Sequence, residues 1–69
     1  IFWEHLGNRG VRMGDWKLVS KDKGQWELYN LRTDRTERIN VFDENQNVSK
    51  KMLKAYRQWA EKVGVRGGP

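Results

Sequence analysis

The residues best suited to chemistry lie together near the N-terminus, in the run EHLGNR at positions 4–9. An imidazole such as that of His5 exchanges a proton near neutral pH, and a guanidinium such as that of Arg9 can bind an anion through two parallel hydrogen bonds. Side chains alternate between the faces of a strand, so Glu4 and His5 serve one site only if the strand bends there. The alternative interpretation is structural, with His5 a packed strand residue and Arg9 a turn residue.

Outside this run, the sequence lacks the usual signatures of catalytic and metal sites. The phosphate-binding patterns G-x-x-x-x-G-K-[ST] and G-x-G-x-x-G are both absent, and no serine has a recognisable nucleophile setting. There is no cysteine and His5 is the only histidine, so neither a Cys-based nor a His-rich metal site can form. We therefore expect no catalytic residue, cofactor or metal in this segment.

The four tryptophans have two possible uses. Indole rings stack on sugars or nucleic-acid bases, and they also fill hydrophobic cores. Trp16, Trp26 and Trp59 occupy core positions in strand or helix patterns, which favours packing. For Trp3 the choice between the two uses stays open.

The length and charge of the chain limit the kinds of partner that it can bind. The chain has 69 residues, enough for one domain at most, and its net charge of +5 permits a polyanionic partner. The basic residues are scattered among acids, which is typical of a solvated surface, and the densest basic cluster is Lys50, Lys51, Lys54 and Arg57. No apolar run approaches the roughly 20 residues that span a bilayer, so we expect no membrane contact.

The fold is organised around residues 15–30, DWKLVSKDKGQWELYN. Two W-x-L units alternate large apolar with charged residues, which is the pattern of strands with one buried face. The polar linker at 21–24 suits a hairpin loop. Pairing would place the apolar side chains on one face and the charged ones on the other: Trp16, Leu18, Trp26 and Leu28 against Lys17 and Glu27.

The remaining elements follow in order. Residues 1–6 predict a strand with bulky groups on both faces, residues 7–10 a tight turn, and residues 11–13 a short strand. All strands thus fall within residues 1–31. Residues 32–46 form a polar surface connection, and its apolar end is expected to pack back on the core through Ile39, Val41 and Phe42.

Residues 47–63 predict a helix, followed by a frayed tail at 64–69. The apolar residues recur at helical spacing and form one stripe, which consists of Val48, Met52, Ala55, Tyr56, Trp59, Ala60 and Val63. Asn45 or Asn47 can cap the helix N-terminus, and Gly64 suits a left-handed C-terminal cap. We predict an α+β fold, a small antiparallel sheet of about four strands with one C-terminal helix across its tryptophan face.

An ordered set of motifs resembles the C-terminal subdomain of sulfatases of the arylsulfatase type. The motifs are E-H-x-G-N-R, V-R-x-G-D-W-K-L and W-E-L-Y-N-L followed by D-R-T-E. The matching residues are Glu4, His5, Gly7, Asn8, Arg9, Val11, Arg12, Gly14, Asp15, Trp16, Lys17, Leu18, Trp26, Glu27, Leu28, Tyr29, Leu31, Asp34, Glu37 and Asn40, with Trp59, Ala60, Val63, Gly64 and Val65 in the terminal helix region. The sequence departs from the family where members often have Ala at Gly10, Asp at Asn30 and Pro at Arg35.

The resemblance implies that residues 1–69 form the C-terminal subdomain of a larger sulfatase, docked on an α/β catalytic domain. In such enzymes a Cys or Ser in a C/S-x-P-x-R motif matures to formylglycine, and a bound calcium balances the sulfate charge. This sequence has no such motif, so formylglycine and calcium are expected in the missing catalytic domain and the fragment alone is expected to be inactive. The resemblance places Glu4, His5 and Arg9 at the rim of the substrate pocket, and it implies a periplasmic or secreted parent enzyme.

Two hypotheses of function follow. In the first, the chain is part of a sulfatase that hydrolyses sulfate monoesters of small molecules or glycans; it stabilises the catalytic domain and shapes the pocket rim. In the second, it is a self-standing basic module that binds polyanions, either a sulfated glycan or single-stranded nucleic acid. The low density of the basic cluster argues against the second hypothesis, and nucleic acid is not an expected partner.

Overall fold

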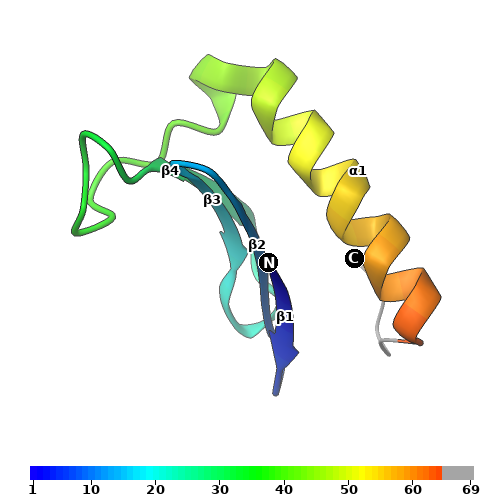
Figure 1. Cartoon of the computed structure of the whole chain (residues 1–69). Helices are drawn as coiled ribbons and strands as arrows, with labels where there is room; N and C mark the ends of the chain where they lie inside the picture. Colours follow the sequence, from blue (N-terminus) through cyan, green and yellow to red (C-terminus); the bar gives the residue numbers. More distant parts are fainter. Residues whose placement is uncertain (65–69) are drawn as a thin grey trace.

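A computed structural model describes residues 1–64. An antiparallel four-stranded sheet has the strand order β1-β2-β3-β4, and one long helix, α1, covers one of its faces (Figure 1). The elements are β1 (Phe2–His5), β2 (Asn8–Met13), β3 (Trp16–Ser20), the 3-10 turn η1 (Lys21–Lys23), β4 (Trp26–Asn30), the 3-10 turn η2 (Asp43–Asn45) and α1 (Gln46–Val63). The predicted α+β class and architecture are confirmed.

The first hairpin is tighter than the sequence predicted. Leu6 and Gly7 alone form the turn, with φ values of 51° and 87°. Two consecutive residues with positive φ reverse the chain in the sense that matches strand twist, so pairing resumes immediately at His5 and Asn8. The predicted turn at residues 7–10 is therefore wrong, because three of its four positions belong to β2.

The central hairpin confirms the predicted arrangement of faces. In its register Leu18 lies opposite Leu28, and Ser20 lies opposite Trp26. Alternation then places Trp16, Leu18, Trp26 and Leu28 on the face toward α1, and Lys17 and Glu27 on the other. The loop is closed at its base, where the Ser20 hydroxyl donates a hydrogen bond to the Gly24 carbonyl at 2.6 Å.

The core lies between α1 and the sheet. Its buried residues come from β2, β3, β4 and α1, and they are Val11, Leu18, Leu28, Met52, Tyr56 and Ala60. The predicted core positions of Trp16, Trp26 and Trp59 are confirmed, because all three are partly buried and pack against this cluster. Phe2 extends the core to the sheet edge by stacking on Trp59, with ring centroids 5.4 Å apart and planes 10° from parallel.

Helix α1 keeps most of its predicted stripe. Gly64 has a φ of 74° and donates its N–H to the Ala60 carbonyl, which confirms the left-handed cap. Val63 is 54% exposed, so the end of the stripe was predicted wrongly. At the other end Asn45 holds the N-cap position without capping, since its amide donates to the Val41 carbonyl at 3.2 Å. The tail predicted beyond Gly64 lies outside the described residues.

The connection between β4 and η2 lies on the side of the sheet away from α1 (Figure 1). Its end is fastened to the outer edge of β4, where Val41 N–H donates to the Leu28 carbonyl at 2.8 Å and Leu28 N–H donates to Asn40 Oδ1 at 3.0 Å. Val41 and Phe42 pack on the core as predicted. Ile39 does not, because it is 63% exposed. Within residues 1–64, no helix has the length and apolar character needed to cross a bilayer.

Candidate functional site

Glu4 and Arg9 come together on the helix-facing side of the first hairpin. They are directly opposite each other in the β1–β2 register. Arg9 is only 8% exposed, and its guanidinium carbon lies 4.8 Å from the centroid of the Trp26 ring, a cation–π distance. Glu4 Oε2 accepts a hydrogen bond from the Gly7 N–H at 3.3 Å. Arg9 is thus a strand residue packed on an indole, and Glu4 is an exposed carboxylate that braces the turn.

His5 belongs to the opposite face. It lies across from Asn8 in the register and is exposed, so it is not the packed strand residue of the structural interpretation. Strand β1 pairs regularly from Phe2 to His5 and does not bend to unite Glu4 with His5. The three predicted rim residues therefore share one end of the sheet but not one face.

The loop η1 is bound to this same end. Lys23 N–H donates to the Gly7 carbonyl at 2.8 Å, and Asp22 N–H donates to Asn8 Oδ1 at 2.8 Å. Asp22 and Lys23 have φ values of 53° and 57°, an uncommon left-handed conformation for residues other than glycine. These bonds join the turn between β1 and β2 to the loop between β3 and β4.

Beneath this end, the Tyr56 hydroxyl is buried between helix and sheet. Among residues 1–64 it has no hydrogen-bond partner. Burial is the main reason that its pKa is raised; the charge of Glu4 raises it further and that of Arg9 lowers it.

A second candidate site lies on the sheet face away from α1, here called the open face. Two hollows, of about 770 and 290 Å³, share Trp3, Lys17 and Glu37 as lining residues. We call them together the open-face groove. The larger hollow is also lined by basic residues, Arg12, Arg32 and Arg35, and the smaller by Asn8, Lys21 and the predicted rim residue Arg9.

Trp3 occupies the centre of the groove because of Gly10. The two residues are opposite each other in the β1–β2 register, and a Cβ atom added to Gly10 would lie 2.4 Å from Trp3 Cζ2. No real Cβ tolerates such a distance, so the indole covers the bare glycine backbone. Trp3 therefore packs on the open face of the sheet and is not part of the core between sheet and helix.

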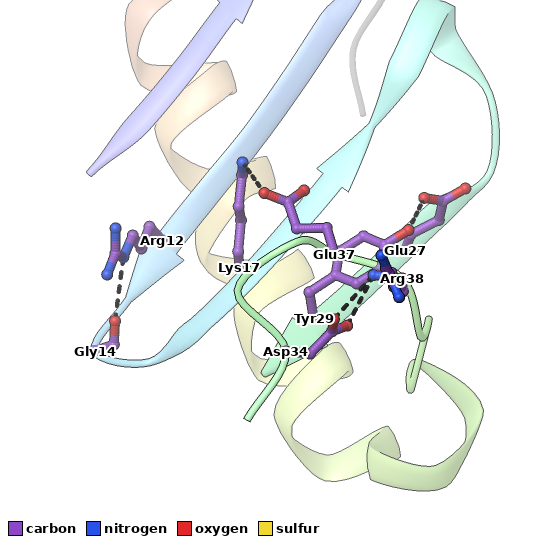
Figure 2. A network of polar contacts seen from close by, with 8 residues as sticks. All are labelled: Arg12, Gly14, Lys17, Glu27, Tyr29, Asp34, Glu37 and Arg38. Atoms are coloured by element: carbon purple, nitrogen blue, oxygen red, sulfur yellow. Dashed lines mark hydrogen bonds and ion pairs between the residues drawn. The ribbon is translucent and has the colours of Figure 1, made fainter. Parts of the chain in front are cut away.

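Lys17 and Glu37 line both hollows of the groove and form the ion pair drawn in Figure 2. Lys17 Nζ lies 2.7 Å from Glu37 Oε2 and 5.8 Å from the centroid of the Trp3 ring. Glu37 reaches this position with a φ of 56°, a strained conformation for a residue with a side chain. The ion pair holds the connection between β4 and η2 against β3.

Asp34 and Tyr29 form further hydrogen bonds in this part of the molecule (Figure 2). Both carboxylate oxygens of Asp34 accept the Arg38 N–H at 3.0 Å, and one accepts the Ile39 N–H at 2.9 Å. These backbone hydrogen bonds lower the pKa of Asp34 below its usual 3.8. The Tyr29 hydroxyl donates to Glu27, and mainly this bond, with burial, raises the pKa of Tyr29 to about 12.

Sequence patterns alone did not identify the open-face groove. Alternation within β3 already placed Lys17 away from the core, and residues 1–6 were expected to carry bulky groups on both faces, so the partial signal was a basic residue on an outward strand position beside a strand with two apolar faces. No sequence pattern indicated the position of Glu37, because this residue lies in an irregular polar segment. The path of that segment depends on the positive φ of Glu37 itself. Within residues 1–64 no group of acidic and histidine side chains could hold a metal ion.

Comparisons with known proteins bear on the fold. No family model matches the sequence. Two crystal structures of Ps i-CgsB, one of them in complex with k-i-k-neocarrahexaose, match 86% of this chain with a TM-score of 0.73 and 23% sequence identity. The match covers only 14% of the Ps i-CgsB chain. This chain therefore has the same fold as one small part of a much longer protein.

Proposed function

We propose that this chain is the C-terminal subdomain of a larger sulfatase that hydrolyses sulfate monoesters of glycans. The supporting observation is the fold match to 14% of Ps i-CgsB, a protein crystallised with k-i-k-neocarrahexaose, a saccharide of the sulfated carrageenan type. The ordered motifs from Glu4 to Asn40 point independently to the same family. The proposal assigns the nucleophile, formylglycine and calcium to a catalytic domain outside this sequence.

Within that enzyme the first hairpin is proposed as part of the substrate-pocket rim. Glu4 and His5 are exposed on opposite faces of β1, so they would contact different parts of a bound sugar or its surroundings. Arg9 has a different role, because its side chain is nearly buried on Trp26. It would act as a positioning residue that holds the β1–β2 hairpin against α1.

The charge of this end suits an anionic substrate. Lys21 and Lys23 are exposed in the loop that is hydrogen-bonded to the β1–β2 turn. A sulfate monoester is negatively charged, and a rim of cations attracts and orients such a ligand at long range. The rim would contribute to binding and orientation and would take no part in bond breaking.

The test needs the full-length enzyme, assayed on a sulfated carrageenan oligosaccharide. Replacement of a rim contact should raise KM or lower turnover, and we expect Glu4→Ala and His5→Ala each to lower kcat/KM roughly tenfold, the effect of one lost hydrogen bond to a charged group. Arg9→Ala should instead lower thermal stability, because it removes a buried cation from the Trp26 ring.

Glu61→Ala is the matched control, since Glu61 is exposed on α1. If both Glu4→Ala and His5→Ala leave kcat and KM unchanged, neither residue contacts the substrate in the pocket. A full-length reading frame with no C/S-x-P-x-R motif, or a purified enzyme that releases no sulfate, would refute the sulfatase assignment itself.

A further inference from the structure

We propose that the open-face groove is a second binding site, for a sulfated oligosaccharide, centred on Trp3 and the larger hollow; the smaller hollow extends it toward the loop that carries Lys21. The groove combines an indole, a half-buried ion pair and three exposed arginines on a surface that α1 does not cover. The choice of a sulfated galactan as ligand rests on the function proposed above. The groove and its chemistry stand independently of that function.

The indole of Trp3 provides a surface for a sugar ring. It lies at the point where the two hollows meet, because it lines both. The absence of a side chain at Gly10 lets the ring settle on the backbone of β2, and any Cβ there would collide with it. Its place on a paired strand makes the ring a rigid platform, and rigid aromatic groups bind with little loss of conformational entropy.

The arginines provide contacts for sulfate groups. Arg12, Arg32 and Arg35 line the larger hollow and are all exposed. The Arg12 Nε donates to the Gly14 carbonyl at 3.3 Å, which orients the side chain and leaves most of its N–H donors for a ligand. A planar guanidinium binds two oxygens of an oxyanion at once, a geometry that sulfate shares with carboxylate and phosphate.

The acidic residues that line the groove do not neutralise the positive charge of the three arginines. Glu37 is committed to Lys17, with which it forms an ion pair. Asp15 is the other acid in the lining, against the three arginines. The groove therefore keeps a positive excess at the end formed by Arg12, Arg32 and Arg35, while the Lys17–Glu37 pair fixes the connection that presents Arg32 and Arg35.

A different polyanion is the alternative occupant, and the test distinguishes it from a sulfated sugar. Binding of the 69-residue chain to a sulfated carrageenan hexasaccharide is measured by calorimetry, with the desulfated hexasaccharide and a single-stranded oligonucleotide of equal charge as comparison probes. Nuclear magnetic resonance of the indole N–H groups reports which tryptophan the ligand touches. We expect the Trp3 signal to shift most.

The decisive variant is Arg32→Ala with Arg35→Ala, because both side chains are exposed and outside the core. We expect the pair to weaken binding at least roughly tenfold, the effect of losing hydrogen bonds to a charged group. Lys51→Ala with Lys54→Ala is the matched control: it removes the same charge from exposed positions on α1 and should change affinity less than about threefold, the effect of general charge alone. Trp3→Phe, which keeps an aromatic cover over Gly10, should also weaken binding.

Several results would overturn the proposal. Equal weakening by the α1 control would show general charge attraction instead of a site. Equal binding of the desulfated saccharide, tighter binding of the oligonucleotide, or no binding at all by the folded chain would each exclude a sulfated-sugar groove. None of these results bears on sulfate release by the full-length enzyme, so the two proposals fail separately.

Discussion

At the scale of single residues, the pairing of Gly10 with Trp3 gives a physical reason for glycine at position 10. Here an added Cβ would lie 2.4 Å from the Trp3 ring and 2.8 Å from the Leu18 carbonyl oxygen. The glycine and the indole are therefore one structural unit, in which the ring supplies the surface that glycine lacks.

Gly10→Ala should accordingly destabilise the chain by about 1–3 kcal/mol, the usual cost of overpacking. The ring has to move to relieve the collision, so the indole fluorescence of Trp3 should change as well. Urea unfolding measures the loss. The loss of stability caused by Gly10→Ala should be smaller when Trp3 is also replaced by alanine. The collision with the ring is then gone, while the contact with the Leu18 carbonyl oxygen remains. An alanine variant as stable as the original chain would show that Trp3 does not rest on Gly10.

At the scale of elements, the connection that follows β4 is ordered by polar contacts and not by hydrophobic packing. Asp34 accepts the backbone N–H groups of Arg38 and Ile39, and Glu37 pairs with Lys17. Only the end of the connection, at Val41 and Phe42, packs on the core. This explains why Ile39 stays exposed despite its apolar side chain: the Asp34 bonds set the path of the backbone before the core is reached.

The order of the connection should depend on pH through Asp34. Its pKa is lower in the folded chain than its ordinary value of 3.8, because the ionised carboxylate accepts backbone hydrogen bonds. The stabilisation is therefore complete above about pH 3.8 and is lost as the pH falls through the lower folded pKa. Asp34→Asn should be less stable than the original chain at neutral pH, and the difference should vanish in acid.

Thermal unfolding of both proteins across the acidic range tests this expectation, and Asp43→Asn, an exposed acid in η2, serves as the control. A stability difference between Asp34→Asn and the original chain that is the same at every pH would argue that the carboxylate charge is not what holds the connection.

At the scale of the whole molecule, a single thin core supports two different surfaces. The buried cluster lies entirely between α1 and one face of the sheet (Figure 1). The open face is ordered by Trp3, the connection and the Lys17–Glu37 pair. A domain of this size rarely gains more than about 3–5 kcal/mol of net stability, so each large core side chain matters.

Leu28→Ala in the 69-residue chain should therefore abolish cooperative unfolding. Leu28 is fully buried, and deletion of such a side chain costs about 2–5 kcal/mol, comparable with the whole stability. Circular dichroism during heating should show a broad transition or none. The control Ile39→Ala should change the stability by less than about 0.5 kcal/mol, since Ile39 is exposed. A sharp transition at the original temperature in Leu28→Ala would show that the chain is more stable than its core suggests.

The sequence by itself determined the class of fold and most of the core. Alternation in the W-x-L units decided which side of β3 and β4 faces α1, and helical spacing decided that Met52, Tyr56 and Ala60 are buried. These predictions succeed because burial of apolar surface is the dominant favourable term in folding and its period is visible in the residues.

The tertiary structure alone decided what the polar residues do. Arg9 was predicted at a pocket rim or a turn, and its side chain is nearly buried on Trp26 because a two-residue turn begins β2 earlier than expected. Glu37 reaches Lys17 across 20 positions of sequence through one left-handed residue. Hydrogen bonds and ion pairs depend on distances between distant segments, which leave no periodic pattern, so the open-face groove emerges only when the strands and the connection are brought together.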